Sequence, residues 1–272
     1  MSKAGKGNLI PDSSHLGITE LRSGIHQFRG EKPGSHTYLI QGWDKNVLID
    51  TGVNNSFPNL TRCLTDLGLE AGDIHLVILT HEHFDHIGAA AFFCETAIIA
   101  AHRLAANKIE LQDEFVTLSR YRDASSRPFY AQLWLEDATF FALGNYELKV
   151  IHTPGHTSGC ICIYEPNERL LFSGDTVFAN GTLSDIYTSG NISDYVNSMR
   201  RLRSLKIDEL YPGHGRISYN PEQDMKQAMR HARKMMHDTK ILFEAINSRR
   251  SADTPHFPHQ GTKDNAPKSP AD

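Results

Sequence analysis

The segment THEHFDHIG, at residues 80–88, constrains the fold of this chain more than any other stretch. It follows an apolar run and leads into a helix start of small residues, so three histidines and an aspartate lie in the turn between a buried strand and a helix. Residues i and i+2 face one way while i+4 and i+5 continue around the turn, which directs ligands at two neighbouring ions. We expect this turn to supply half of a two-metal site. Its candidate ligands are His81, His83, Asp85 and His86.

The length of 272 residues allows one large domain, and composition separates its ends from its middle. Residues 1–16 are polar and expected to be flexible, while residues 249–272 are rich in Pro, Ser, Lys and Asp and expected to be disordered. Residues 17–248 then form the folded domain. Its last helix is expected at residues 221–248, where Pro221 suits the first helical turn.

The lack of a recognisable membrane span or signal peptide, together with the cysteine usage, favours a soluble, cytoplasmic protein with no membrane association. No apolar run approaches the roughly 20 residues of a membrane span, and the N-terminus lacks the apolar centre of a signal peptide. The cysteines show no spacing typical of a disulfide framework, and they fit a reducing compartment. They are Cys63, Cys94, Cys160 and Cys162.

The net charge of -4 conceals an uneven distribution. Residues 1–193 carry 14 basic and 22 acidic side chains, whereas residues 194–250 carry 12 basic and 7 acidic ones. The basic segment falls mostly on expected helices, where it forms either a solvated face or a surface for an anionic substrate.

Hydrophobic periodicity predicts an alternation of strands and helices that is typical of an α/β arrangement. Besides the last helix, the expected helices span residues 57–67 and 194–205. The expected strands span residues 17–29 (a strand or hairpin), 36–41, 46–49, 74–79, 97–100, 146–151, 160–164, 170–172 and 209–211.

Residues 102–138 are the least regular part of the expected domain, and we interpret them as an insertion or lid. The first ten residues are compatible with a helix, but the aromatic residues that follow show no clean period. They serve either in packing or as an apolar wall near a substrate mouth. These aromatics are Phe115, Tyr121, Phe129, Tyr130 and Trp134.

Four further candidate residues each lie just past an expected strand, where loops gather at one edge of a sheet. Pro154 and Gly155 force a tight turn that presents His156. His214 lies between two glycines, which permit a close approach of the backbone to an ion. The remaining two are Asp50, in DTG, and Asp175, in SGDT.

In this combination the chain resembles the metallo-β-lactamase superfamily. Asp50, the HxHxDH turn, PGHTSG, SGDT and PGHG occur in the family's order, over residues 20 to about 220. The resemblance implies an α+β fold of four layers, the αβ/βα sandwich, in which two mixed β-sheets pack face to face with helices outside and the metals at one edge.

The resemblance also implies a role for each candidate residue. Asp175 bridges two divalent ions per chain, and Asp50 orients a ligand histidine. The mixed nitrogen and oxygen donors fit zinc best, with iron or manganese as alternatives. The first ion is held by His81, His83 and His156, and the second by Asp85, His86 and His214.

The implied chemistry is hydrolysis. Two ions about 3.5 to 4 Å apart share a water, lower its pKa to about 7 and stabilise the oxyanion that develops after attack on an acyl carbon or phosphorus. Asp85 both binds metal and orients the water or accepts its proton.

Within the superfamily the chain is most similar to the glyoxalase II-like branch, which favours a thioester or ester substrate. It departs from the hydroxyacylglutathione hydrolases after Asp175, where it reads TVFANGTLSDIYTSGN, and after His214, where Gly215-Arg216 follows. We therefore expect an anionic substrate that is either coenzyme A-like or glutathione-like. Position suggests Phe178 and Tyr187 as substrate contacts, and a homodimer is a further expectation.

Other functions remain open at this point. The long basic helix also resembles the lactamase-like endoribonucleases, although the acidic protein as a whole disfavours nucleic acid. A lactonase and a metal-binding regulatory protein with incidental hydrolysis are further alternatives. Hydrolysis of β-lactams is placed last because no secretory signal is present.

Overall fold

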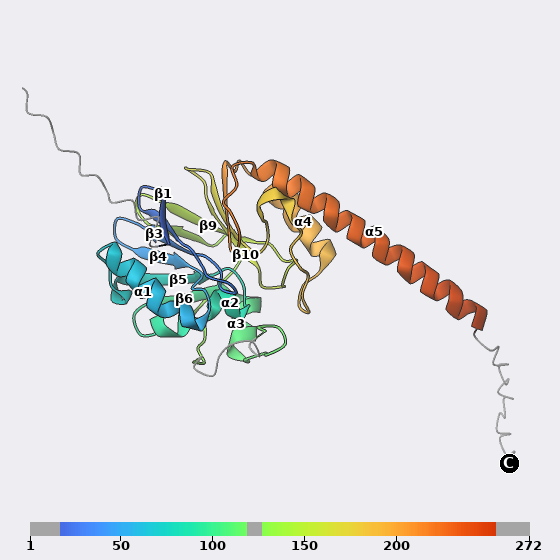
Figure 1. Ribbon diagram of the computed structural model, residues 1–272, viewed down its shortest axis with the longest axis horizontal. Coiled ribbons are helices and arrows are strands. Elements are labelled where there is room, and N and C mark those ends of the chain that lie inside the picture. The colour runs from blue at the N-terminus through green and yellow to red at the C-terminus, as the bar shows by residue number, and fades with distance from the viewer. Residues whose placement is uncertain (1–16, 119–126, 254–272) are drawn as a thin grey trace, which may run out of the picture. The chain divides into compact units, whose positions relative to one another are not determined.

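Strands that are mostly apolar and buried on both faces build two mixed β-sheets (Figure 1). The computed structural model describes residues 17–118 and 127–253. Within these residues the first sheet has seven strands in chain order. They are β1 (Ile18–Arg22), β2 (Ile25–Phe28), β3 (Thr37–Gln41), β4 (Asn46–Ile49), β5 (Ile74–Leu79), β6 (Ile98–His102) and β7 (Leu133–Leu135).

The second sheet has five strands among the described residues, in the order β12-β11-β10-β9-β8. Its strands are β8 (Phe140–Ala142), β9 (Glu147–His152), β10 (Ile161–Glu165), β11 (Leu170–Gly174) and β12 (Glu209–Pro212). Both sheets are mixed, because β4 to β7 pair in parallel in the first and β11 pairs in parallel with β12 in the second.

Helices cover the outer face of each sheet (Figure 1). Along the chain, α1 (Phe57–Asp66) lies between β4 and β5, α2 (Phe84–Ile87) between β5 and β6, and α3 (Arg103–Glu110) between β6 and β7, whereas the second sheet carries α4 (Ile192–Leu202) and the start of α5 (Pro221–Asp253). Short 3-10 turns are η2 (Asn54–Ser56), η3 (Ala71–Asp73), η4 (Ala90–Phe93) and η6 (Ala179–Gly181). This is the expected four-layer αβ/βα sandwich.

The period of two in the strands explains the layers, because successive side chains of a strand point to opposite faces. In β5, Leu76 and Ile78 enter the core between the two sheets, while Val77 and Leu79 enter the core under α1 and α3. In β10, Ile163 faces the first sheet. Each such aliphatic side chain contributes about 1.5–3 kcal/mol through burial, so the strand pattern itself selects the sandwich.

The segment at residues 102–138 contributes to the first sheet at its β7 edge. α3 packs on β6 and β7, and β7 pairs in parallel with β6. Residues 119–126, with Tyr121, lie outside the described part of the chain. Whether this segment acts as a lid stays a prediction.

α5 runs to Asp253, past the predicted helix end at residue 248. The sequence has no helix breaker before Pro255, and a proline disfavours helix at the residue before it. By its contacts the chain divides into a unit up to Lys234 and a second unit from Met235. The flexible N-terminus expected at residues 1–16, and residues 254–272 of the predicted disordered tail, lie outside the described residues. Of the described helices, none combines the length and apolar character needed to cross a membrane.

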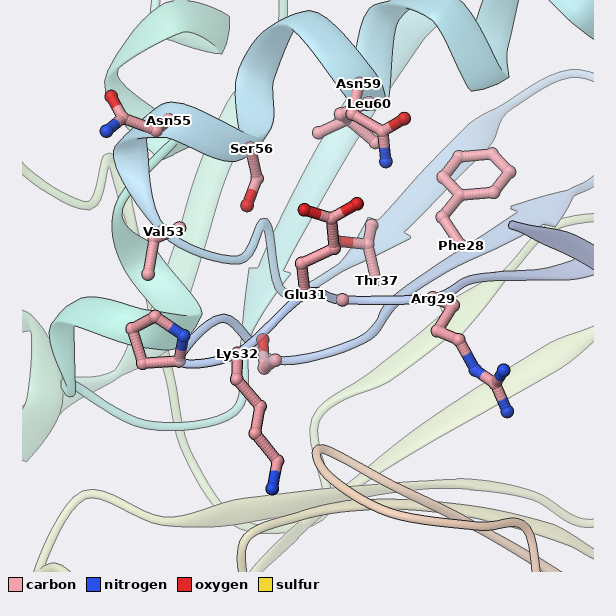
Figure 2. A pocket seen from close by; sticks show the side chains of 13 residues that line it. Phe28, Arg29, Glu31, Lys32, Thr37, Val53, Asn55, Ser56, Asn59 and Leu60 are labelled. Atoms are coloured by element: carbon pink, nitrogen blue, oxygen red, sulfur yellow. The ribbon is translucent and has the colours of Figure 1, made fainter. Parts of the chain in front are cut away.

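The loop between β2 and β3 is fastened to loops that follow other strands. Ser35 N donates to Asp85 O at 2.9 Å, and His36 N donates to Gly213 O at 2.7 Å. A cavity of about 270 Å³ separates this loop from the start of α1. Figure 2 shows Glu31 on the side of the loop that faces α1, and Lys32 on the opposite side.

Candidate metal centre

The predicted ligands lie together because they follow strands that run in one direction. β4 and β5 are parallel neighbours, and β9, β11 and β12 are parallel within the second sheet. The carboxyl ends of these strands therefore meet at one edge, where loops gather. A hydrogen bond of 2.8 Å from Ile161 N to Thr80 O joins the two sheets there.

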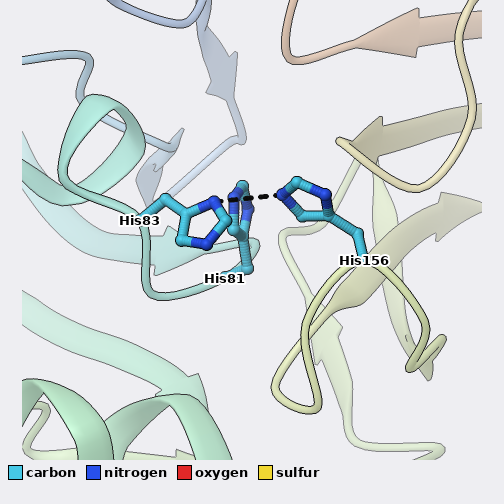
Figure 3. Close-up of side chains that lie close together, drawn as sticks. All are labelled: His81, His83 and His156. Atoms are coloured by element: carbon cyan, nitrogen blue, oxygen red, sulfur yellow. Dashed lines mark hydrogen bonds between the residues drawn. The ribbon is translucent and has the colours of Figure 1, made fainter. Parts of the chain in front are cut away.

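Three histidines form the first group of ligand atoms, which we name the three-histidine group: His81, His83 and His156. Figure 3 shows the three rings converging from two loops, with His83 Nδ1 lying 3.0 Å from His156 Nε2. All three side chains are buried. His81 and His83 come from the turn after β5, and His156 comes from the turn after β9.

The second group, named the mixed group, consists of Asp85, His86 and His214. Nε2 of His214 lies 3.2 Å from Nε2 of His86 and 3.1 Å from Oδ2 of Asp85. Asp85 and His86 belong to the single turn of α2, whereas His214 follows β12.

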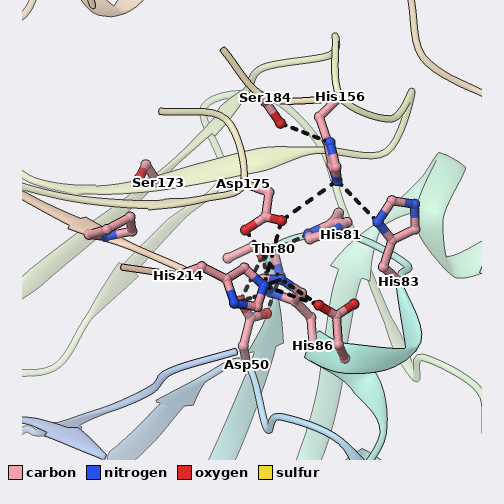
Figure 4. A network of polar contacts seen from close by, with 12 residues as sticks. Asp50, Thr80, His81, His83, His86, His156, Ser173, Asp175, Ser184 and His214 are labelled. Carbon is pink, nitrogen blue, oxygen red and sulfur yellow. Dashed lines mark hydrogen bonds and ion pairs between the residues drawn. The ribbon is translucent and has the colours of Figure 1, made fainter. Parts of the chain in front are cut away.

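Asp175, directly after β11, faces both groups (Figure 4). Its Oδ1 lies 3.3 Å from His86 Nε2, and its Oδ2 lies 3.7 Å from His214 Nε2 and 3.8 Å from His156 Nε2. One carboxylate thus touches nitrogen atoms of the three-histidine group and of the mixed group.

Asp50 fixes two of the histidines through its two oxygens. Oδ2 accepts a hydrogen bond of 2.7 Å from His86 Nδ1, and a second of 2.7 Å from the Thr80 hydroxyl. Thr80 Oγ1 lies 3.2 Å from His81 Nδ1, and Thr80 N donates to Asp50 Oδ1 at 2.7 Å. With Nδ1 of each ring donating, Nε2 carries the lone pair that a metal needs. Asp50 has a φ of 57°, a conformation that Asp tolerates better than most residues.

His156 is oriented in the same way by another loop. Its Nδ1 lies 2.6 Å from Asp185 O and 2.9 Å from Ser184 Oγ, so Nδ1 donates to the carbonyl and Nε2 is left free for the centre. Tyr187 N also donates to His156 O at 3.1 Å.

The donor atoms fit divalent metal ions. Nε2 of His81 and Oδ1 of Asp175 are buried, and neither has a hydrogen-bond partner among the described residues. Two nitrogen ligands at about 2.0–2.1 Å from a tetrahedral zinc lie about 3.3 Å apart, which is close to the nitrogen–nitrogen distances of 3.0 and 3.2 Å in the two groups. An uncompensated pair of facing nitrogens is otherwise costly in a buried site.

Charge also prepares the cluster for cations. Burial lowers the pKa of His83 to about 3, and burial together with neighbouring histidines lowers the pKa of His81 well below its usual value. Burial opposes ionisation of Asp175, but His86 and the other histidines outweigh it and lower the pKa of that carboxyl. Conversely, the carboxylates of Asp175, Asp50 and Asp85 outweigh burial and raise the pKa of His86. The neutral imidazoles of His81 and His83 and the ionised carboxylates are in the forms that bind metal, whereas the raised pKa of His86 means that its ring must release a proton when a cation binds.

The two expected substrate contacts differ in position. Tyr187 is 38% exposed, and its ring packs edge-on against His83 and His156, with centroids 4.8 and 5.2 Å away. Phe178 is half-buried before η6, and among the described residues no hydrogen bond or ring contact joins it to the cluster. The segment that follows α3 reaches the site through Thr117, whose carbonyl accepts from Phe84 N at 2.9 Å.

Several residues of the site were not anticipated from the sequence. Glu82 is fully buried although it lies between two candidate ligands, and Ser184 and Asp185 hold His156 from a loop distant in the chain. His36 spans Gly30 N and Gly215 O, at 3.0 and 2.8 Å. Only Glu82 carried a signal in the sequence, since it occupies the position between two histidines that face the opposite way.

Comparison with known proteins agrees with this geometry. The model of the metallo-beta-lactamase superfamily matches residues 31–214, which include every candidate ligand. The chain belongs to the metallo-β-lactamase superfamily. It is a hydrolase of a family whose members use divalent metal ions, and its two ligand groups could hold such ions.

Within this superfamily, the chain is similar to two proteins named as thioesterases and to a solved structure. The chain is 32% identical over 208 residues to "Acyl-coenzyme A thioesterase MBLAC2" of Homo sapiens, covering 66% of this chain and 72% of that protein. It is 27% identical over 252 residues to "Atrochrysone carboxyl ACP thioesterase" of Aspergillus fumigatus, covering 90% and 71%. Among solved structures, a metallo-beta-lactamase family protein from Thermus thermophilus superposes with a TM-score of 0.69 at 22% identity, over 80% of this chain and 82% of that one, and supports the fold.

Proposed function

We propose that this chain hydrolyses acyl-coenzyme A thioesters at a two-metal centre. The observation that carries the centre is Asp175, whose two oxygens face the three-histidine group and the mixed group at 3.3 to 3.8 Å. The similarity to an acyl-coenzyme A thioesterase supports the thioester, and a glutathione thioester has no such support here.

The three-histidine group would hold one ion and the mixed group the other, with Asp175 between them. The donor set contains more imidazole than carboxylate and no thiolate, which favours zinc over calcium or magnesium. Iron and manganese remain alternatives for the same donors.

The two ions would supply a water activated near neutral pH and stabilise the oxyanion at the acyl carbon. Asp85 is the residue we assign to orienting that water and accepting its proton, because its carboxyl is ionised and lies at the centre, His86 and the hydrogen bond from His214 outweighing burial and lowering its pKa. The leaving group is a thiolate, which is far less basic than an alkoxide, so this reaction needs little help from a general acid.

Tyr187 is assigned to the substrate mouth. Its ring covers His83 and His156 while more than a third of the residue stays exposed, so an acyl group can contact it without displacing a ligand. Phe178 stays a prediction from sequence position.

A small anionic thioester is therefore the proposed partner, and a homodimer remains a prediction. The cytoplasmic location is likewise proposed from cysteine usage, since Cys63, Cys94, Cys160 and Cys162 are free.

The test is a substrate panel with protein loaded with zinc, iron or manganese, and with the chelated protein as control. The panel contains acyl-coenzyme A of several chain lengths, acyl-glutathione, a homoserine lactone, a β-lactam and single-stranded RNA. We expect turnover of acyl-coenzyme A, and about two ions per chain by metal analysis. Cleavage of RNA or lactone with no thioester turnover would replace the proposed substrate, and fewer than two ions per chain would remove the two-metal centre.

A further inference from the structure

Glu82 is a buried carboxylate that lies in the middle of the metal-binding turn without facing the metals. Its exposure is 0%, and it sits between His81 and His83, whose rings point into the cluster. Successive residues in extended backbone point to opposite sides, so Glu82 is directed away from the ligand atoms and into the surrounding loops.

Those loops are the ones that carry and orient His156. The Thr157 hydroxyl donates to Glu82 Oε2 at 2.9 Å, and the Ser189 hydroxyl donates to Oε1 at 3.2 Å. Ser158 N donates to Ser189 Oγ at 3.3 Å, which links the two donor loops to each other. One carboxylate thus connects three chain segments.

Each of these segments contributes to the three-histidine group or its support. The turn after β5 provides His81 and His83, and the turn after β9 provides His156. The loop before α4 provides the carbonyl of Asp185, which accepts from His156 Nδ1. The hydrogen bonds of Glu82 therefore join the three segments that carry or support the three-histidine group.

The packing around Glu82 leaves no room for a side chain at Gly159. A Cβ added at Gly159 would lie 2.6 Å from Glu82 Oε2 and 2.6 Å from the Ala105 side chain. The absence of a side chain at Gly159 lets the carboxylate reach Thr157 between α3 and the turn that bears His156.

The mixed group has separate supports. Its residues are held by Asp50 on His86, by Ser35 N on Asp85 O, and by His36 beside the loop of His214. None of these bonds includes Glu82.

We propose that Glu82 is a positioning residue that fixes the three-histidine group for its ion, acting as a hydrogen-bond acceptor for Thr157 and Ser189. This inference rests on the proposed two-metal centre. Loss of the acceptor lowers the affinity of that group for its ion and leaves the mixed group unchanged.

The experiment measures zinc affinity by calorimetry in two backgrounds that each retain one ligand group. In His214→Ala the remaining ion lies in the three-histidine group, and adding Glu82→Ala should weaken its binding about tenfold, the lower end of the range for loss of a ligand's direct hydrogen-bond partner, because Glu82 bonds Thr157 and Ser189 and not a ligand side chain. In His156→Ala the remaining ion lies in the mixed group, and Glu82→Ala should change its affinity less than threefold, about the scatter of such measurements. Cobalt(II) absorption of the same proteins reports the coordination directly.

Conservative variants keep the test decisive if Glu82→Ala does not fold. Glu82→Gln retains an oxygen acceptor and should restore zinc affinity to within about threefold, whereas Ser189→Ala removes one bond and should weaken the three-histidine group alone. Glu165→Ala is the matched control, because Glu165 is equally buried but accepts from Glu168 N on a turn after β10.

The outcomes separate the inference from the proposed function. Wild-type protein that binds fewer than two ions overturns the two-metal centre and this inference with it. Wild-type protein that binds two, with Glu82→Ala and Ser189→Ala weakening neither group or both equally, overturns the role of Glu82 alone.

Discussion

Asp175 is the residue on which the proposed centre depends most, because it faces both ligand groups. Replacing it by alanine removes the shared carboxylate and leaves an excess of imidazole around two cations. We expect Asp175→Ala to lose at least one ion per chain and to lower kcat/KM by about 10³-fold or more, as for other groups that act at the reacting atoms. Metal analysis and thioester turnover check this.

The control for this variant is Asp208→Asn, which neutralises an exposed partner of Arg169. It should retain both ions and nearly full activity, because exposed ion pairs contribute little. Full activity in Asp175→Ala would contradict the placement of Asp175 between the ions.

Asp50 acts on the ligands through geometry. In Asp50→Asn, an amide would place a donor or a poorer acceptor against His86 Nδ1 and Thr80 Oγ1, which now lie 2.7 Å from Oδ2. We expect metal affinity to fall about 10- to 100-fold. Zinc titration of the variant measures this, and an unchanged affinity would show that backbone packing alone orients His86.

The clustering of the candidate ligands could be predicted from the sequence, because each of them follows a strand in a short motif, while their binding of metal stays a prediction. Ser184 and Asp185 could not, since their bonds to His156 depend on a loop whose path no local pattern specifies. Phe178 was named by position alone, and the contacts of the described residues do not link it to the site.

At the scale of elements, the junction of β6 and α3 contains a stacked pair of histidines, of which His102 is buried and His152 is half-buried. His102 caps α3 by accepting from Leu104 N through Nδ1 at 3.4 Å, and it stacks on His152 with ring centroids 3.8 Å apart. Burial, with smaller contributions from His152 and Arg103, lowers the pKa of His102 to about 4, and Asp137 opposes this.

This pair predicts a loss of stability in weak acid. The folded pKa of about 4 lies below the unfolded value of about 6.5, so the fold prefers neutral His102. The contribution of neutral His102 to the free energy of unfolding is complete above pH 6.5. It falls by about 3 kcal/mol in total as the pH drops from 6.5 to 4. Denaturant unfolding at a series of pH values should show a shallower decline for His102→Asn, which keeps a capping oxygen but does not titrate.

The exposed His237 provides a comparison, because its side chain is 71% exposed beside Asp238. His237→Asn should follow the wild-type pH profile. An identical profile for His102→Asn as well would mean that other groups account for the acid lability.

Elements whose apolar residues form a clear pattern could be predicted from the sequence, whereas strands of only three residues could not. β4, β5 and β10 occupy the expected runs, because both of their faces are buried and apolar. β7 and β8 have three residues each, and their pairing with β6 and β9 makes them strands without a pattern of their own.

At the scale of the whole molecule, α5 belongs to the fold only in its first part. Met225, Ala228, Met229 and Ala232 are buried against the second sheet, whereas Met235 and Ile241 are 47% and 52% exposed. We expect removal of residues 235–272 to change the free energy of unfolding by less than about 1 kcal/mol and to leave hydrolysis intact. Thermal and denaturant unfolding measure the first, and thioester turnover the second.

A shorter chain ending at Asn220 is the informative contrast. It removes the buried methionines of α5, each of which contributes about 2–5 kcal/mol, and should not fold stably. If both truncated proteins were equally destabilised, residues 235–272 would contribute to stability, and this prediction would be wrong.

The sandwich was predictable as a whole because the family motifs occur in order. The ion pairs of the basic segment, residues 194–250, could not be predicted, because charge counts do not say which side chains pair. Arg201 of this segment bonds Asp137 outside it, so part of the segment's positive charge is balanced by a neighbouring carboxylate. The substrate is not encoded in such counts, because recognition depends on which few groups face the metals.

The hydrogen bond between Thr80 and Ile161 marks where the two sheets meet, and the ligands of the three-histidine group lie on both sides of it. An ion bound at the proposed centre would crosslink the two halves of the chain, so its binding free energy would also stabilise the docking of one half on the other. At a free metal concentration about 1,000 times Kd this linkage amounts to about 4 kcal/mol, a large share of the stability of a domain. Supply of the metal would then govern how much of the protein persists as well as how fast it works.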